Sequence, residues 1–286
     1  MSETARPSAQ HPRPTRSALA TATGLPRNRG VTFPRVLQAE WCKAWTLTST
    51  RWGVLAAILA NGAVALYMAY NARYATQAPA PRTSDLLTLG LVASQLPIIT
   101  IGVMITATEY SSGGVRSTFL AAPRRGLVLA AQALTSGIAA ALTAATTLCL
   151  TLLALQVFKH DLAPGFDPLA PETSRMLGGF VLYALTAAVL GASLGSLSRS
   201  TTTGLVSALG IVFLLPQAIE LLGSPRLIAV LPGWAGALVA KSDVAAAAAV
   251  DQIGAALAPW QGYGVLATWT LAALLTALVR LNRTPL

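Results

Sequence analysis

Residues 127–157 read LVLAAQALTSGIAAALTAATTLCLTLLALQV, a run that contains no charged side chain. The hydrocarbon core of a bilayer is about 30 Å thick, and about 20 helical residues cross it. Five other runs approach this length, so that the six predicted spans are residues 52–70, 86–107, 127–157, 177–197, 203–222 and 261–279. The first five contain no Lys or Arg, and their only acid is Glu220. The sequence therefore predicts an all-α, polytopic membrane protein with six transmembrane helices.

The charge distribution predicts how these spans are oriented. Hydrophobic residues make up 54% of the chain and charged residues 10%, against about 25% charged in a soluble domain. If the N-terminus is cytoplasmic, the inner segments hold 14 of the 20 Lys and Arg residues and the outer segments hold six. The positive-inside rule therefore favours two cytoplasmic termini. Topology and anionic lipid explain the net charge of +10, and we expect no nucleic-acid partner.

Two segments precede the first span. Residues 1–32 are basic, acid-poor and without an apolar run, which is typical of a disordered cytoplasmic tail. Residues 33–286 are predicted to form one six-span domain. Within it, residues 33–51 have a helical period, with Arg35 and Lys43 away from an apolar face that carries Leu37, Trp41 and Trp45. This pattern indicates an amphipathic helix in the membrane interface, or else a cytoplasmic helix packed on protein.

The segment before the last span, residues 223–260, is also apolar in part. It contains the apolar stretch 227–240 and an alanine run at 245–249. Fourteen residues are too few to cross a bilayer, so we expect a re-entrant or interfacial pair of short helices here.

The most specific motif is the inner loop 109–125, EYSSGGVRSTFLAAPRR. Two glycines loosen the chain, a short amphipathic helix follows, and Pro123 disfavours helix at Ala122. The loop resembles the coupling-helix region of ABC-2 type (type-2 exporter) ABC transporter permeases, which reads roughly Glu-Tyr, two variable residues, Gly-Thr-Ile-Arg, then Pro-Arg-Arg. The matching positions are Glu109, Tyr110, Gly113, Arg116, Pro123, Arg124 and Arg125, whereas Gly114 and Val115 depart from the pattern.

The resemblance extends to the layout of the spans, and the stretches 231–236 and 259–262 are similar to the outer loop of actinobacterial members. It implies a permease subunit in a bacterial cell membrane, paired with a second permease subunit and with two separate cytosolic ATPase subunits. An amphipathic or lipid-like substrate would pass along a dimer interface lined by spans one, two and five. The residues that the resemblance assigns to ATPase coupling are Glu109, Tyr110, Gly113, Val115, Arg116, Phe119 and Leu120. Alternatively, Arg116, Arg124 and Arg125 are only positive-inside anchors.

The chain contains no Gly-x-x-x-x-Gly-Lys-Ser/Thr motif, so ATP hydrolysis is expected in a partner. We predict no catalytic residue, cofactor or metal site. Residues 191–195, GASLG, match the nucleophile elbow of α/β-hydrolases, but the preceding strand and a nearby histidine base are missing. Small residues at this spacing favour close packing of helices in lipid. The polar residues within the spans are expected to bridge helices or line a path; they are Asn61, Gln95, Gln132, Gln156, Gln217 and Glu220.

Two other functions remain open from the sequence. The chain could be a non-transporting anchor or sensor subunit for a partner protein, or a secondary carrier or channel. The carrier receives little support, because no pair of charges lies within the predicted spans.

Overall fold

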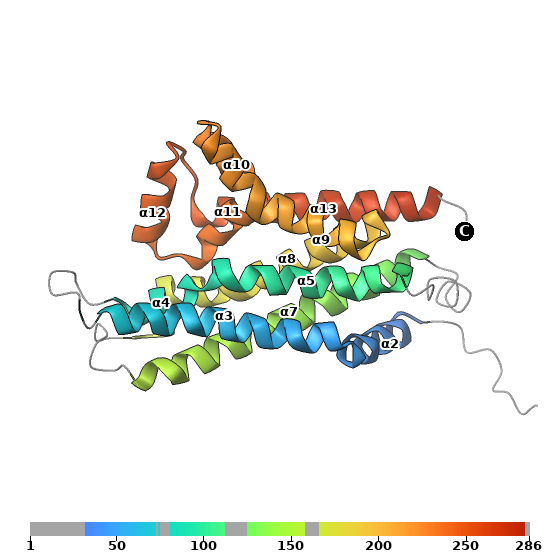
Figure 1. Ribbon diagram of the computed structural model, residues 1–286, viewed down its shortest axis with the longest axis horizontal. Coiled ribbons are helices and arrows are strands. Elements are labelled where there is room, and N and C mark those ends of the chain that lie inside the picture. Colours follow the sequence, from blue (N-terminus) through green and yellow to red (C-terminus); the bar gives the residue numbers. More distant parts are fainter. Residues whose placement is uncertain (1–31, 73, 75–80, 112–124, 158–165, 284–286) are drawn as a thin grey trace, which may run out of the picture. The chain divides into compact units, whose positions relative to one another are not determined.

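The computed structural model describes residues 32–72, 74, 81–111, 125–157 and 166–283, which form helices with no strand among them (Figure 1). The α-helices are α2 (Phe33–Thr46), α3 (Thr48–Ala72), α4 (Thr83–Leu89), α5 (Leu91–Ser111), α7 (Arg125–Leu155), α8 (Pro171–Ser198), α9 (Thr201–Leu209), α10 (Leu215–Leu221), α11 (Pro232–Ala237), α12 (Asp243–Gln252) and α13 (Pro259–Arg283). Three further turns are the π-helical η2 (Gly210–Leu214) and the 3-10 helices η3 (Pro225–Val230) and η4 (Leu238–Ala240). These elements belong to one compact unit, Phe33–Leu286.

Six helical segments are long and apolar enough to cross a membrane, which confirms the predicted polytopic, all-α fold. They are Thr48–Ala72, Leu91–Tyr110, Gly126–Leu155, Pro171–Ser198, Thr201–Leu221 and Pro259–Arg283. The second span starts later than predicted, because α4 ends at Leu89 and Gly90 separates it from α5. A Cβ atom at Gly90 would lie 2.6 Å from Asn61 Cα, so only glycine fits where α3 crosses this break.

The helices α5 and α8 form the centre of the bundle, and their backbones approach closely. A Cβ atom added at Gly102 of α5 would lie 2.0 Å from Ala188 O, and one added at Gly191 of α8 would lie 2.6 Å from Ile99 O. Side chains of both helices are buried at this crossing, including Ile99 and Leu190. Small residues let two helices gain dispersion contacts over a large area, which is the main source of helix association in lipid.

The hydrolase-like motif at 191–195 is part of this crossing. Ser193 lies within α8 and donates a hydrogen bond to Val189 O at 2.8 Å. A Cβ atom at Gly195 would lie 2.5 Å from Thr106 Oγ1 of α5. The described backbone around Ser193 is helix and not the strand-to-helix turn of an elbow, so the packing interpretation of this motif is confirmed.

The fifth span changes direction between α9 and α10, as Figure 1 shows, and Pro216 lies in the first turn of α10. Because proline has no N–H, it cannot donate to the carbonyl four residues earlier, at Val212, and the π-helical turn η2 precedes it. Helix α11 packs against this irregular turn. A Cβ atom at Gly233 would lie 2.3 Å from Val212 O.

The segment 225–240 does not cross the bundle, as predicted from its length. It consists of η3, α11 and η4, and the residues from Pro232 to Ala240 other than Trp234 are buried against α8, α13 and η2. Irregular backbone at membrane depth is stable only where protein covers it. The segment therefore enters the bundle, and α12 follows it after the capping residue Ser242.

Three of the six predicted intramembrane polar residues bridge helices. Asn61 Nδ2 donates to Leu87 O at 3.2 Å and to Thr151 Oγ1 at 3.1 Å, and Tyr183 Oη donates to Gln95 Oε1 at 2.5 Å. Gln132 of α7 contacts α5. The side chains of Gln156, Gln217 and Glu220 are exposed.

Candidate functional site at the junction of α2, α5 and α7

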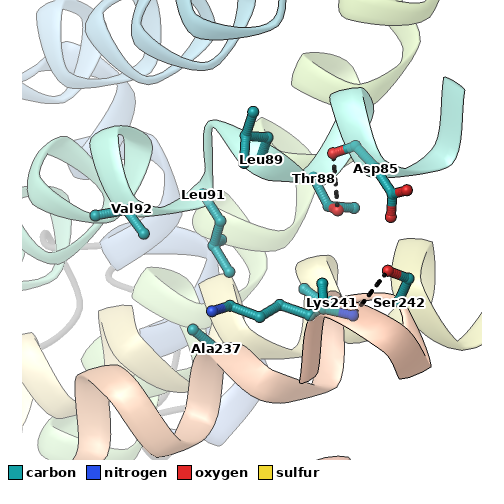
Figure 2. A pocket seen from close by; sticks show the side chains of 10 residues that line it. Asp85, Thr88, Leu89, Leu91, Val92, Ala237, Lys241 and Ser242 are labelled. Carbon is teal, nitrogen blue, oxygen red and sulfur yellow. Dashed lines mark hydrogen bonds between the residues drawn. The ribbon is translucent and has the colours of Figure 1, made fainter. Parts of the chain in front are cut away.

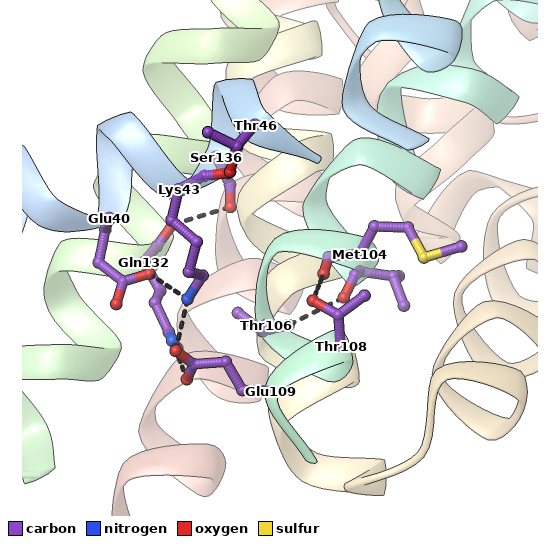
Figure 3. Close-up of polar contacts among 10 residues, drawn as sticks. Glu40, Lys43, Thr46, Met104, Thr106, Thr108, Glu109, Gln132 and Ser136 are labelled. Carbon is purple, nitrogen blue, oxygen red and sulfur yellow. Dashed lines mark hydrogen bonds and ion pairs between the residues drawn. The ribbon is translucent and has the colours of Figure 1, made fainter. Parts of the chain in front are cut away.

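A cluster of charged and polar side chains joins three helices at one end of the bundle (Figure 3). Lys43 Nζ of α2 lies between two carboxylates: it is 2.7 Å from Glu40 Oε2 and is also paired with Glu109 Oε1 of α5. Gln132 Nε2 of α7 donates to Glu109 Oε2 at 2.6 Å. Each carboxylate oxygen of Glu109 therefore contacts a different helix.

Helix α2 turns its polar residues toward the protein at this junction. Glu40 and Ala44 are buried one turn apart, and Ala44 packs with Ile101 and Ile105 of α5. Trp41 and Trp45 are half-buried, with ring centroids 5.8 Å apart and an edge-to-face arrangement. Leu37 is half-buried as well. The helix thus packs on protein through the Glu40 side, while its aromatic face stays partly open to its surroundings.

The Lys43 ammonium group contacts both carboxylates, Glu40 on its own helix and Glu109 on α5. Burial is the main cause that raises the pKa of Glu40 above its usual 4.5; the Lys43 ammonium opposes this shift and the Glu109 carboxylate adds to it. Side-chain exposure is 6% for Glu40, 11% for Glu109 and 30% for Lys43, so only the lysine retains substantial contact with solvent.

The raised pKa predicts that the ionised form of Glu40 destabilises the folded protein. Below its usual pKa of 4.5, Glu40 is protonated in both states and contributes no difference; as pH rises through the folded pKa, ionisation in the buried site reduces the free energy of unfolding. We expect Glu40→Gln to remove this loss, so that wild type loses stability relative to the variant as pH rises through the range above 4.5. Thermal unfolding in detergent across that range measures the effect.

The matched control for this pH series is Glu220→Gln, because the side chain of Glu220 is exposed. This variant should keep the wild-type dependence on pH. A Glu40→Gln protein that loses stability with rising pH as steeply as wild type would show that the buried carboxyl does not contribute to that dependence.

The predicted coupling residues lie next to this cluster or in the loop that follows it. Glu109 is a member of the cluster, and Tyr110 is half-buried at the end of α5. Gly113, Val115, Arg116, Phe119 and Leu120 lie outside the described residues, as do Gly114, Pro123 and Arg124. The described helices nonetheless fix both ends of this loop, because α5 ends at Ser111 and α7 begins at Arg125.

Sequence reasoning missed Lys43 and Gln132 as partners of Glu109, and Glu40 as the second carboxylate that pairs with Lys43. Gln132 was recognisable as a polar residue within a span, whereas Lys43 lies off the apolar face of its own helix and gave no signal. The Lys43–Glu109 pair joins residues 66 positions apart, so no local pattern reports it.

A second ionic network lies at the opposite end of the bundle. The Arg175 guanidinium of α8 donates to Val239 O at 2.9 Å, to Lys241 O at 3.0 Å and to Asp243 Oδ1 at 2.7 Å. Glu172 Oε1 accepts a hydrogen bond of 2.7 Å from the Asp243 N–H group. The network satisfies carbonyl groups at the end of η4 and fixes the start of α12 to α8.

The two ends of the bundle therefore differ in their chemistry. One end holds the Glu40–Lys43–Glu109–Gln132 cluster next to the ends of α5 and α7, and the other holds the buried 231–240 segment attached by Arg175. Comparison of the chain with models of protein families, with curated proteins and with solved structures finds no match.

Proposed function

We propose that this chain is the membrane permease subunit of an ATP-driven ABC exporter of the ABC-2 type. In this proposal, cytosolic ATPase subunits bind the 109–125 loop, and two permease subunits, identical or similar, enclose the substrate path. The observation that carries the proposal is the position of the motif-bearing loop: it connects the central helix α5 to α7, and both are joined to α2 by the Glu109 cluster.

This arrangement supports a mechanical role for the loop. A push on residues 112–124 would reach α5 and α7 at once, and Lys43 would carry it to α2. Because α5 crosses α8 at backbone contact near Gly102, the two central helices would move together. Packed helices of this kind transmit displacement as rigid bodies, which is what coupling to ATPase closure requires.

The exposed apolar faces bear on where a second subunit would bind. The share of buried residues in the most apolar stretch of each span is 61% for the second span, 28% for the first and 17% for the fifth. The first span exposes Trp52, Leu59 and Tyr67 along its length. Spans one and five are therefore better placed than span two to face a partner subunit, which departs from the path lining that the family resemblance implied.

The orientation in this proposal places the Glu109 cluster in the cytoplasm of a bacterial cell, with both termini on that side. Described basic residues at that end of the bundle are Arg35, Lys43, Arg51, Arg125, Arg199, Arg280 and Arg283, and those at the other end are Arg82, Arg175, Arg226 and Lys241. Together with the sequence count of 14 against six, this asymmetry supports the assignment.

The test is to purify tagged protein from native membranes in mild detergent and to identify co-purifying proteins by mass spectrometry. We expect a stoichiometric cytosolic subunit that bears a P-loop, and we expect Arg116→Ala combined with Phe119→Ala to reduce its recovery by about tenfold, as the loss of one interface anchor does. The matched control is Arg283→Ala, which removes a basic residue from the same end of the bundle but outside the loop.

Recovery of the chain alone, under conditions that preserve a known ABC complex, would contradict the proposal. Recovery with an unrelated protein would instead favour the anchor or sensor function. Equal recovery of the P-loop subunit by wild type and the loop variant would keep the exporter but move its ATPase contact away from this loop.

A further inference from the structure

A cavity of about 210 Å³ opens between the α4–α5 break and the buried η4 segment (Figure 2). Its walls are mostly apolar and include Leu89, Leu91, Val92 and Ala237. Two ionisable side chains line it, Asp85 of α4 and Lys241 after η4. The cavity lies at the end of the bundle opposite to the Glu109 cluster.

The Lys241 ammonium has no partner in the part of the chain that the structure describes. Its neighbour in sequence, Asp243, pairs with Arg175 instead. The position of Lys241 is nevertheless fixed, because Arg175 binds its carbonyl oxygen. Burial lowers the pKa of Lys241 below its usual value.

The two charges lie at different depths of the cavity. Figure 2 shows the Lys241 side chain running along the wall toward Leu91 and Ala237, while the Asp85 carboxylate points to the side of Ser242. Leu91 is the first residue of the second span, and Asp85 lies two turns before it in α4. The ammonium is therefore closer to the membrane core, and the carboxylate is closer to the aqueous boundary.

The cavity also continues toward the membrane core. A smaller one of about 100 Å³ shares Val92, Ala237 and Lys241 with it and is lined further in by Gln95 and Phe213. At the side, Leu89 is 48% exposed and Val92 is 51% exposed, so an apolar surface leads out of the cavity toward lipid. Sites for whole drug-sized ligands measure about 300–1,000 Å³, so a cavity of this size suits a head group whose tails remain outside.

We propose that this cavity binds the head group of a zwitterionic phospholipid of the phosphatidylethanolamine class, with its phosphate at Lys241, its ammonium group at Asp85 and its acyl chains over Leu89 and Val92. In a bilayer the phosphate of such a lipid lies deeper than the amine, which is the order of Lys241 and Asp85. An anionic lipid would satisfy Lys241 but would leave Asp85 facing a negative or neutral group. A soluble zwitterion would gain nothing from the exposed leucine and valine at the cavity edge. The site does not depend on the proposed transport function.

The experiment measures lipid binding to the delipidated full-length protein in detergent by native mass spectrometry. Three probes are compared: dioctanoyl-phosphatidylethanolamine, dioctanoyl-phosphatidylglycerol and glycerophosphoethanolamine, which has the head group without acyl chains. We expect the first to bind best. Lys241→Met should weaken its binding by about tenfold or more, because a charge-assisted hydrogen bond is lost.

Two further variants separate the contributions of charge. Asp85→Asn should weaken binding of phosphatidylethanolamine and leave phosphatidylglycerol unchanged or tighter, and Arg226→Met, which removes an exposed cation at the same end, should change neither. Thermal unfolding of each variant checks that it is folded. Equal binding to wild type and to folded Lys241→Met would overturn the proposal. Equal binding of phosphatidylethanolamine and phosphatidylglycerol would also overturn it, because the surface would then be non-selective. Glycerophosphoethanolamine that binds as well as phosphatidylethanolamine would overturn it too, because the ligand would then be a soluble molecule.

Discussion

Replacing Gly102 with alanine is expected to lower the stability of the bundle by about 3 kcal/mol, at the upper end of the usual cost of overpacking. The added Cβ atom would lie 2.0 Å from Ala188 O, whereas ordinary contact begins near 3.4 Å. The obstructing atom belongs to the backbone of α8, so no side-chain rotation relieves the clash. The helices must separate along the α5–α8 crossing, the most extensive contact between any two of the described helices. Thermal unfolding in detergent, followed by size-exclusion chromatography, measures the loss.

Gly178→Ala is the matched control for this variant. Gly178 lies in the α8 helix, and an added Cβ atom there meets nothing within 4 Å. Alanine has the higher helix propensity, so this variant should be as stable as wild type or more stable by up to about 1 kcal/mol. If Gly102→Ala and Gly178→Ala unfold at the same temperature, the close contact between α5 and α8 does not hold the bundle together.

The six spans were predictable because their signal is local. Each span is a long apolar run bounded by charge, and length alone decides whether it can cross a bilayer. The boundaries were less accurate where tertiary contact changes the helix. The break at Gly90 depends on the approach of α3 through Asn61, and the π-helical turn at 210–214 accompanies Pro216 and the contact with α11. Neither contact leaves a periodic trace in the sequence.

The candidate site was only partly predictable for a related reason. The loop motif drew attention to Glu109, but its partners come from residues 43 and 132, which lie on other helices. Lys43 illustrates the difficulty, because a helical wheel reports only the polarity of its own helix. A polar residue becomes buried when a complementary charge lies opposite, and here that charge is supplied by α5. Arg175 is similar, since its carbonyl partners lie 64 and 66 residues away.

Replacing Lys43 with methionine is expected to destabilise the junction by about 3 kcal/mol, the lower end of the range for breaking a buried ion pair. Methionine preserves most of the apolar stem and removes the ammonium group, so the carboxylates of Glu40 and Glu109 would lose the cation that lies between them. The estimate is at the lower end because the Lys43 side chain is 30% exposed and solvent screens part of the loss. A reduced thermal stability and faster proteolysis within α2 are the expected results.

Combining Lys43→Met with Glu40→Gln and Glu109→Gln separates the cost of removing Lys43 from beside two carboxylates from the contribution of the ion pair itself. Because replacing every member of a buried ionic group is often nearly neutral, the triple variant should recover most of the lost stability. Lys43→Arg should retain it, since a cation remains between the two carboxylates. Under the proposed function, the coupling of ATPase closure to movement of the spans gives a further readout. If the Lys43–Glu109 ion pair connects α5 to α2, the triple variant would be stable and yet would not transmit ATPase closure from α5 to α2. A triple variant as unstable as Lys43→Met would mean that the lysine stem, and not the charge balance, holds α2 on the bundle.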